Sequence, residues 1–109
     1  PSPPPPEPNL LPSMYRVEIA DFLRLNLENP TKIRDAYISE PVLKPVSGTS
    51  RYVACVRYTP RDSKDRYQAG QEKTAIFWAG RLNQFLAVNT ELCANAVYQR
   101  FPEAEVLVP

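Results

Sequence analysis

The spacing of apolar residues first follows a helical period. Between residues 13 and 29 such side chains recur every three or four positions, which predicts an amphipathic helix with charged residues on its outer face. The apolar members of this pattern are Tyr15, Ile19, Phe22, Leu23 and Leu27. Ser13 is a candidate N-cap, and the Asn-Pro pair at 29–30 ends the helix, because the residue before proline avoids the helical region. We expect Phe22 and Leu23 to be buried against a sheet.

The next part of the chain favours β-strands. The expected strands are residues 35–43, 51–59, 72–79 and 81–88, because β-branched and aromatic residues are frequent there. The glycines at 48 and 80 lie in the turns between neighbouring strands, and residues 60–71 form a long polar loop. Pro41 and Pro45 place the first strand at an edge or make it irregular.

The last twenty residues leave more than one interpretation open. The segment that begins at Thr90 is either a short helix with Thr90 as its N-cap or an irregular tail. The final residues, EVLVP, are expected to add a short edge strand.

These elements predict an α+β domain, in which the N-terminal helix packs on a three- to four-stranded antiparallel meander. Neither element can bury its apolar side alone, so the helix must cover one face of the sheet. In the strand 51–59, the face with Tyr52, Ala54, Val56 and Tyr58 is expected to meet the helix. The opposite face carries Arg51, Val53, Cys55 and Arg57, with the arginines pointing to solvent.

Composition divides the chain into two parts. The chain has 109 residues and 13 prolines, many of which lie in the opening PSPPPPEP. Proline fixes φ and donates no backbone hydrogen bond, so residues 1–12 are predicted to form an extended tether that packs on nothing. Residues 13–109 then form a single domain. No run of apolar residues is long enough for a membrane span.

The residue types present favour binding over catalysis. The chain has no histidine, which removes Ser-His-Asp and Cys-His nucleophilic sites, and it has only three glycines and no phosphate-binding loop. Its two cysteines, Cys55 and Cys93, match no zinc-binding spacing. The acidic residues are spread along the chain, and nothing in the sequence singles out a catalytic pair. We expect no enzymatic activity, no cofactor and no metal.

Positive charge is concentrated in the middle of a chain that is otherwise nearly neutral. Residues 44–81 contain eight basic and three acidic residues, a net charge of +5, whereas the whole chain carries +1. The candidate binding surface in this stretch consists of Arg57, Arg61, Lys64, Arg66 and Tyr67. Basic residues interleaved with tyrosines are compatible with a polyanion- or nucleic-acid-binding domain. They are equally compatible with solvent-facing arginines on a strand, and an anionic glycan, a lipid headgroup or an acidic protein would fit as well as nucleic acid.

The residues alone leave the state of the two cysteines open between one disulfide and two unconnected buried thiols. The strings NPTKIRDAYISEPVLKPV and RYVACVRYTPRDS, which follow a proline-rich start, resemble an uncharacterised family of small envelope lipoproteins from alpha-class proteobacteria. The similarity covers most of residues 14–101. It implies a leader that ends in a lipidated cysteine just before Pro1, a periplasmic location and no known activity.

An oxidising periplasm favours a structural disulfide between Cys55 and Cys93. The expected role is therefore that of a periplasmic binding or structural module, held at an envelope membrane only by a lipid anchor outside this chain. Its partner is expected to be an envelope component, either a protein or an anionic glycan or lipid, and not nucleic acid. We expect the protein to be a monomer. The runner-up is a soluble polyanion- or nucleic-acid-binding domain that uses the basic stretch 44–81.

Overall fold

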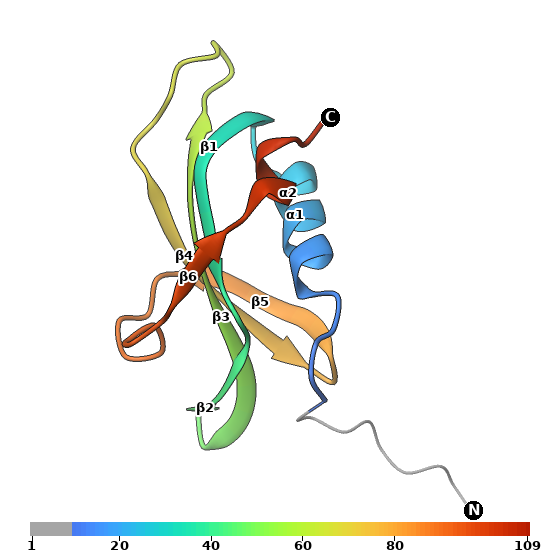
Figure 1. The fold of residues 1–109 in the computed structure, drawn as a ribbon, viewed down its shortest axis with the longest axis vertical. Helices are drawn as coiled ribbons and strands as arrows, with labels where there is room; N and C mark the ends of the chain where they lie inside the picture. The colour runs from blue at the N-terminus through green and yellow to red at the C-terminus, as the bar shows by residue number, and fades with distance from the viewer. Residues whose placement is uncertain (1–9) are drawn as a thin grey trace, which may run out of the picture.

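A computed structural model gives the fold of the chain and describes residues 10–109. The predicted α+β class is confirmed, with helices on one side of an antiparallel sheet (Figure 1). In chain order the elements are α1 Tyr15–Asn26, β1 Asn29–Ser39, β2 Val42–Val46, β3 Thr49–Arg61, β4 Gln71–Trp78, β5 Arg81–Ala87, β6 Tyr98–Arg100 and α2 Pro102–Glu105.

The long strand β3 is the central strand of the sheet and pairs with three others. The strand order is β5-β4-β3-β1-β6, and β2 also pairs with β3. One edge of β3 is covered by β4, while β1 and β2 share its other edge end to end. The sheet thus has six strands, which is more than the three to four predicted.

The strand predicted over residues 35–43 is in fact two strands, because Glu40 and Pro41 interrupt it. Ile38 lies opposite Val56 and Val42 lies opposite Val53, so this side has one residue more than β3 over the same distance. Such an extra residue is a β-bulge, and Pro41 suits it because proline donates no ladder hydrogen bond.

Helix α1 buries the predicted face but begins and ends at other residues than predicted. Ile19, Ala20 and Leu23 are buried, and Phe22 is partly buried with its ring centroid 4.9 Å from that of Phe85. The predicted Ser13 cap is wrong, because the N-cap position is Met14 and no side chain caps the helix. The helix also ends earlier than predicted, which allows β1 to begin at Asn29.

The predicted edge strand over EVLVP is wrong, because α2 ends at Glu105 and residues 106–109 are neither helix nor strand. Pro102 stands in the first turn of α2, where a missing N–H costs nothing. This turn places Phe101 and Ala104 in the core. It also satisfies both backbone groups of Ala36, since the Phe101 N–H donates to the Ala36 carbonyl (2.9 Å) and the Ala36 N–H donates to Glu105 Oε2 (3.0 Å).

The packed domain begins before the predicted boundary at Ser13. Pro12 is buried, and Leu10 lies so near the β4–β5 turn that a Cβ on Gly80 would come within 3.0 Å of its Cδ2. The prediction that residues 1–12 pack on nothing is therefore wrong for this end of the segment. Residues 1–9 of the predicted tether lie outside the described residues.

The core lies between the helices and one face of the sheet, as the alternation in β3 predicted. Ala54, Val56 and Tyr58 belong to the buried cluster, and Tyr52 packs against it from the periphery. Burial also raises the pKa of Tyr58. Neither helix in residues 10–109 has the length and apolar character that crossing a bilayer requires.

Leu23 and Leu25 allow a matched test of the helix face, since the first is 1% exposed and the second 66% exposed. We expect Leu23→Ala to lower the free energy of unfolding by about 2–5 kcal/mol, because it leaves a cavity in the core. Leu25→Ala should change it by less than about 0.5 kcal/mol. Urea denaturation of both variants measures the difference, and equal losses would mean that the helix buries another face.

Candidate functional site

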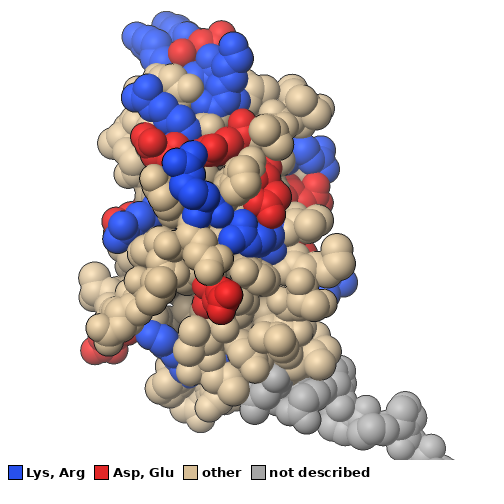
Figure 2. Space-filling view, viewed as in Figure 1, with Lys and Arg blue, Asp and Glu red and all other residues tan. Residues whose placement is uncertain are grey.

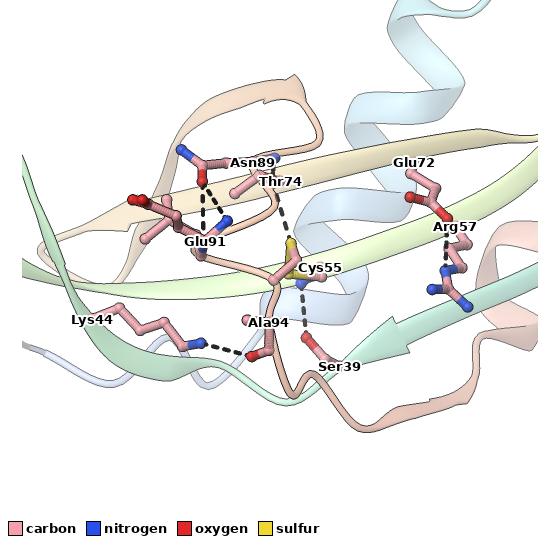
Figure 3. The surroundings of a disulfide bond; sticks show 11 residues. Ser39, Lys44, Cys55, Arg57, Glu72, Thr74, Asn89, Glu91 and Ala94 are labelled. Atoms are coloured by element: carbon pink, nitrogen blue, oxygen red, sulfur yellow. Dashed lines mark hydrogen bonds and ion pairs between the residues drawn. A yellow bond between two sulfur atoms is a disulfide. The ribbon is translucent and has the colours of Figure 1, made fainter.

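The face of the sheet opposite the helices carries a disulfide at its centre. Cys55 of β3 is bonded to Cys93, 38 residues later, with a Cα–Cα distance of 5.9 Å (Figure 3). The predicted pairing is confirmed, and the described part of the chain has no free cysteine. The bond fastens the connection between β5 and β6 onto this face, on the side away from α1 (Figure 1).

Two buried hydroxyl groups support the disulfide from the neighbouring strands. Ser39 of β1 accepts a hydrogen bond at Oγ from the Cys55 N–H (2.7 Å). Thr74 of β4, the cross-strand neighbour of Cys55, accepts at Oγ1 from the Asn89 N–H (2.9 Å) and lies 3.4 Å from Cys93 Sγ (Figure 3). Nothing in the sequence pattern singles out either hydroxyl, because only the strand register shows that they flank Cys55.

The connecting loop, residues 88–97, is stabilised by hydrogen bonds to one of its own residues, Asn89. Asn89 accepts at Oδ1 from the backbone N–H groups of Glu91 (3.0 Å) and Leu92 (3.1 Å). The Cys93 N–H donates to the Asn89 carbonyl (2.9 Å). Of the two interpretations of this segment the irregular one is correct, and Asn89, not Thr90, caps its run of turns.

A cavity of about 400 Å³ lies between this loop and the sheet, and we call it the disulfide cleft. Its sheet side is formed by the end of β1, by β2 and by β3, and its other wall is the loop. The lining residues are Ser39, Glu40, Val42, Lys44, Val53, Cys55, Leu92, Ala94, Asn95, Ala96, Val97 and Gln99. Across the cleft, Lys44 Nζ donates to the Ala94 carbonyl (3.2 Å; Figure 3).

The disulfide cleft has a mixed lining of apolar, polar and charged side chains. Six of the twelve lining residues are valine, leucine or alanine, and the charged groups are Glu40 and Lys44. Pockets for small ligands or single side chains typically combine such an apolar lining with a few polar groups that set orientation. The arrangement can therefore hold an apolar group and orient it by one carboxylate and one ammonium group.

The predicted basic surface is divided between two places. Arg61, Lys64, Arg66 and Tyr67 lie at the outer end of the β3–β4 hairpin, where basic and acidic side chains are mixed (Figure 2). Arg57 lies farther down β3, where it pairs with Glu72 (3.1 Å) and stacks on the ring of Tyr98 (4.1 Å).

The hairpin end is largely neutralised by its own acids. Asp65 Oδ1 is 3.6 Å from Arg61 Nη2, and Asp62 Oδ2 is 3.2 Å from Arg66 Nε. Backbone hydrogen bonds from Arg66 and Lys64, together with the Arg66 charge, lower the pKa of Asp62. Tyr67 is covered by the Arg34 guanidinium, 3.9 Å from the ring centroid.

The basic stretch 44–81 therefore forms no single patch. Lys44 and Arg51 stand opposite each other in the β2–β3 hairpin, whereas Arg61 is the last residue of β3. A strand of 13 residues spans about 40 Å, so the two groups are far apart. A polyanion would meet them as separate small clusters.

The chain matches no family model, no curated protein and no solved structure. The resemblance to envelope lipoproteins consequently stays a prediction from local sequence strings. The disulfide cleft is the candidate site because it combines an apolar lining with two charged side chains and is larger than the hollow on β1, β3 and β4. The smaller one, of about 280 Å³, lies on β1, β3 and β4 around the Arg57–Glu72 pair.

Ser39→Ala tests whether the buried hydroxyl supports the disulfide strand. Without its Oγ the Cys55 N–H has no acceptor, and a buried unsatisfied donor costs about 1–3 kcal/mol. Ser50→Ala, at an exposed position in the same sheet, is the matched control and should be nearly neutral. Urea denaturation of the oxidised proteins gives both values, and a neutral Ser39→Ala would show that the N–H finds another partner.

Proposed function

We propose that the protein is a non-enzymatic binding module of the bacterial periplasm and that the disulfide cleft holds its ligand. The observation that carries this proposal is the cleft itself, an apolar-lined cavity of about 400 Å³ with a covalently anchored wall. Clefts that bind small ligands have volumes of roughly 300–1,000 Å³, and this cleft lies within that range.

The anchoring of the cleft favours binding over a purely structural role. Its loop wall is tied down at three points: by the disulfide at Cys93, by the Asn89 N–H bonded to Thr74, and by Lys44 at Ala94. A wall that is already ordered loses little conformational entropy when a ligand arrives. The entropy cost of ordering the cleft wall is then met during folding and not during ligand binding.

The periplasmic location is proposed from the disulfide and from the resemblance described above. Disulfides persist in oxidising compartments and are rare in the cytosol. We also propose that the protein is a monomer, anchored as a lipoprotein through a lipid outside this chain, and that its ligand belongs to another envelope component. Fractionation of the source cells tests the location, since recovery of the protein in the cytosol would overturn it.

Binding in the cleft can be tested without knowledge of the natural ligand. In ¹H–¹⁵N NMR spectra of the oxidised protein, small apolar fragments such as indole and cyclohexanol should shift the amides of Val42, Val53 and residues 94–97. The amides of α1 should not move. Shifts that are absent, or that are scattered over the surface, would contradict the proposal.

Two alanines in exposed loops provide a matched pair of variants. Ala94 lines the cleft, whereas Ala69 lies in the β3–β4 hairpin. Ala94→Trp should fill the cleft and abolish the fragment shifts, while Ala69→Trp should leave them unchanged. Fragment binding that survives Ala94→Trp would place the site elsewhere.

A further inference from the structure

The outer edge of β2 is left uncovered by the rest of the sheet. Strand β6 pairs with β1 from Tyr37 to Ser39 and begins at Tyr98, so it stops short of β2. The preceding residues, 94–97, leave the plane of the sheet because Cys93 is bonded onto its face. Among residues 10–109, β2 therefore has β3 as its only strand partner.

The register of the β2–β3 hairpin identifies the backbone groups that point outward. Its turn is Ser47–Gly48, with φ of 50° and 81°, as in a two-residue type I′ turn. Val46 and Thr49 beside the turn then form a hydrogen-bonded pair, and bonded and non-bonded pairs alternate from there.

By this alternation, Val42 and Lys44 direct their backbone groups toward β3, and Leu43 and Pro45 direct theirs outward. Proline has no N–H, so the free edge offers one donor, at Leu43, and two acceptors, at Leu43 and Pro45. An extended peptide backbone is the ligand that matches a donor and acceptors at strand spacing. Pro45 limits such pairing to a short segment, which protects the edge from unlimited association.

The side chains next to this edge define which residues the peptide should carry. Val42 and Lys44 both line the cleft and are two positions apart, so they lie on the same face of β2. Val42 is 52% exposed and Val97, on the opposite wall, is 77% exposed, so an apolar side chain would bury both. Cross-strand neighbours of Val42 and Lys44 on an added strand would likewise be two positions apart.

The positive charge of Lys44 favours an acidic side chain at the peptide position opposite it. Lys44 stands opposite Arg51, and like charges in cross-strand positions repel each other. Neither makes an ion pair within the described residues: Lys44 donates to the Ala94 carbonyl, and Arg51 lies over the Trp78 ring (4.6 Å). A carboxylate beside Lys44 would supply the missing partner.

We propose that β2 binds an extended segment of a partner protein by strand addition, with an apolar residue opposite Val42 and an acidic residue opposite Lys44. The segment pairs with the free backbone groups of Leu43 and places its apolar side chain in the disulfide cleft. This inference rests on the proposed function, because it names the ligand class of the same cleft.

The test begins with selection of random heptapeptides displayed on phage against the oxidised full chain. Enriched sequences should carry an apolar and an acidic residue two positions apart. Synthetic copies should bind in fluorescence polarisation and should shift the Leu43 amide in NMR spectra. They should also slow its hydrogen exchange, because the amide becomes hydrogen-bonded.

Two pairs of variants separate backbone pairing from charge. Leu43→Pro removes the outward N–H without removing a β3 ladder bond and should weaken peptide binding by about tenfold, whereas Leu43→Ala keeps the N–H and should weaken it less. Lys44→Glu should weaken binding by about tenfold and should prefer peptides in which lysine replaces the acidic residue. Lys64→Glu, the same charge change at the far hairpin, should have no effect. Unchanged urea midpoints show that each variant is folded.

The outcomes distinguish this inference from the proposed function. Equal binding of a selected peptide by the wild type and by Leu43→Pro would overturn strand addition. If apolar fragments shift the cleft amides but no peptide is enriched, the peptide inference fails and the cleft remains a binding site. If neither fragments nor peptides bind, both fail.

Discussion

The bond between Cys55 and Cys93 is the constraint on which the second face of this domain depends. The helix side of the sheet is closed by the main apolar core, whereas the other side is covered by the loop of residues 88–97, over a smaller set of buried side chains outside that core: Val53, Cys55 and Ile76. A cross-link over 38 residues stabilises a fold by roughly 3–4 kcal/mol in the chain-entropy model, which is large against the marginal stability of a small domain. The cross-link therefore holds the loop in place where the apolar packing beneath it is small.

The cleft follows from the position of that bond. Cys93 is held above the middle of β3, yet five residues later Tyr98 must lie in the plane of the sheet beside Ser39. The intervening chain has to descend past the edge of β2 and cannot pair with it. Both the cavity and the unpaired edge result from this descent, so the same covalent constraint produces the two features that we connect with ligand binding.

The sequence was informative where periodicity was long and misleading where pairing decided the structure. The α1 stripe and the alternation in β3 correctly identified the buried faces, because each pattern extends over many residues. Strand β6 has three residues and is a strand only because β1 lies beside it. The extra residue at Glu40–Pro41 is likewise recognisable only from the pairing with β3. The same pairing shows that residues 35–43 belong to two strands.

The candidate site was predicted in part for the same reason. The residues alone left the pairing of Cys55 and Cys93 open, and it was predicted only through the resemblance to periplasmic lipoproteins. Ser39, Thr74 and Lys44 join the two cysteines only through the strand register and the path of the loop. The basic stretch shows the converse error, since charges adjacent in sequence were separated along a strand of 13 residues and paired with nearby acids. Linear charge density is a poor guide when a strand carries the residues from one end of a domain to the other.

Hydrogen exchange in a Cys55→Ala/Cys93→Ala double variant, compared with the wild type by mass spectrometry, tests the central role of the disulfide most directly. Residues 88–97 should exchange at nearly the rate of an unfolded chain, while α1, β3 and β4 should keep most of their protection. This result would show that the bond holds the loop and the cleft, and that the apolar core holds the rest. Unchanged protection of residues 88–97, or an equal loss of protection in α1, would contradict the account.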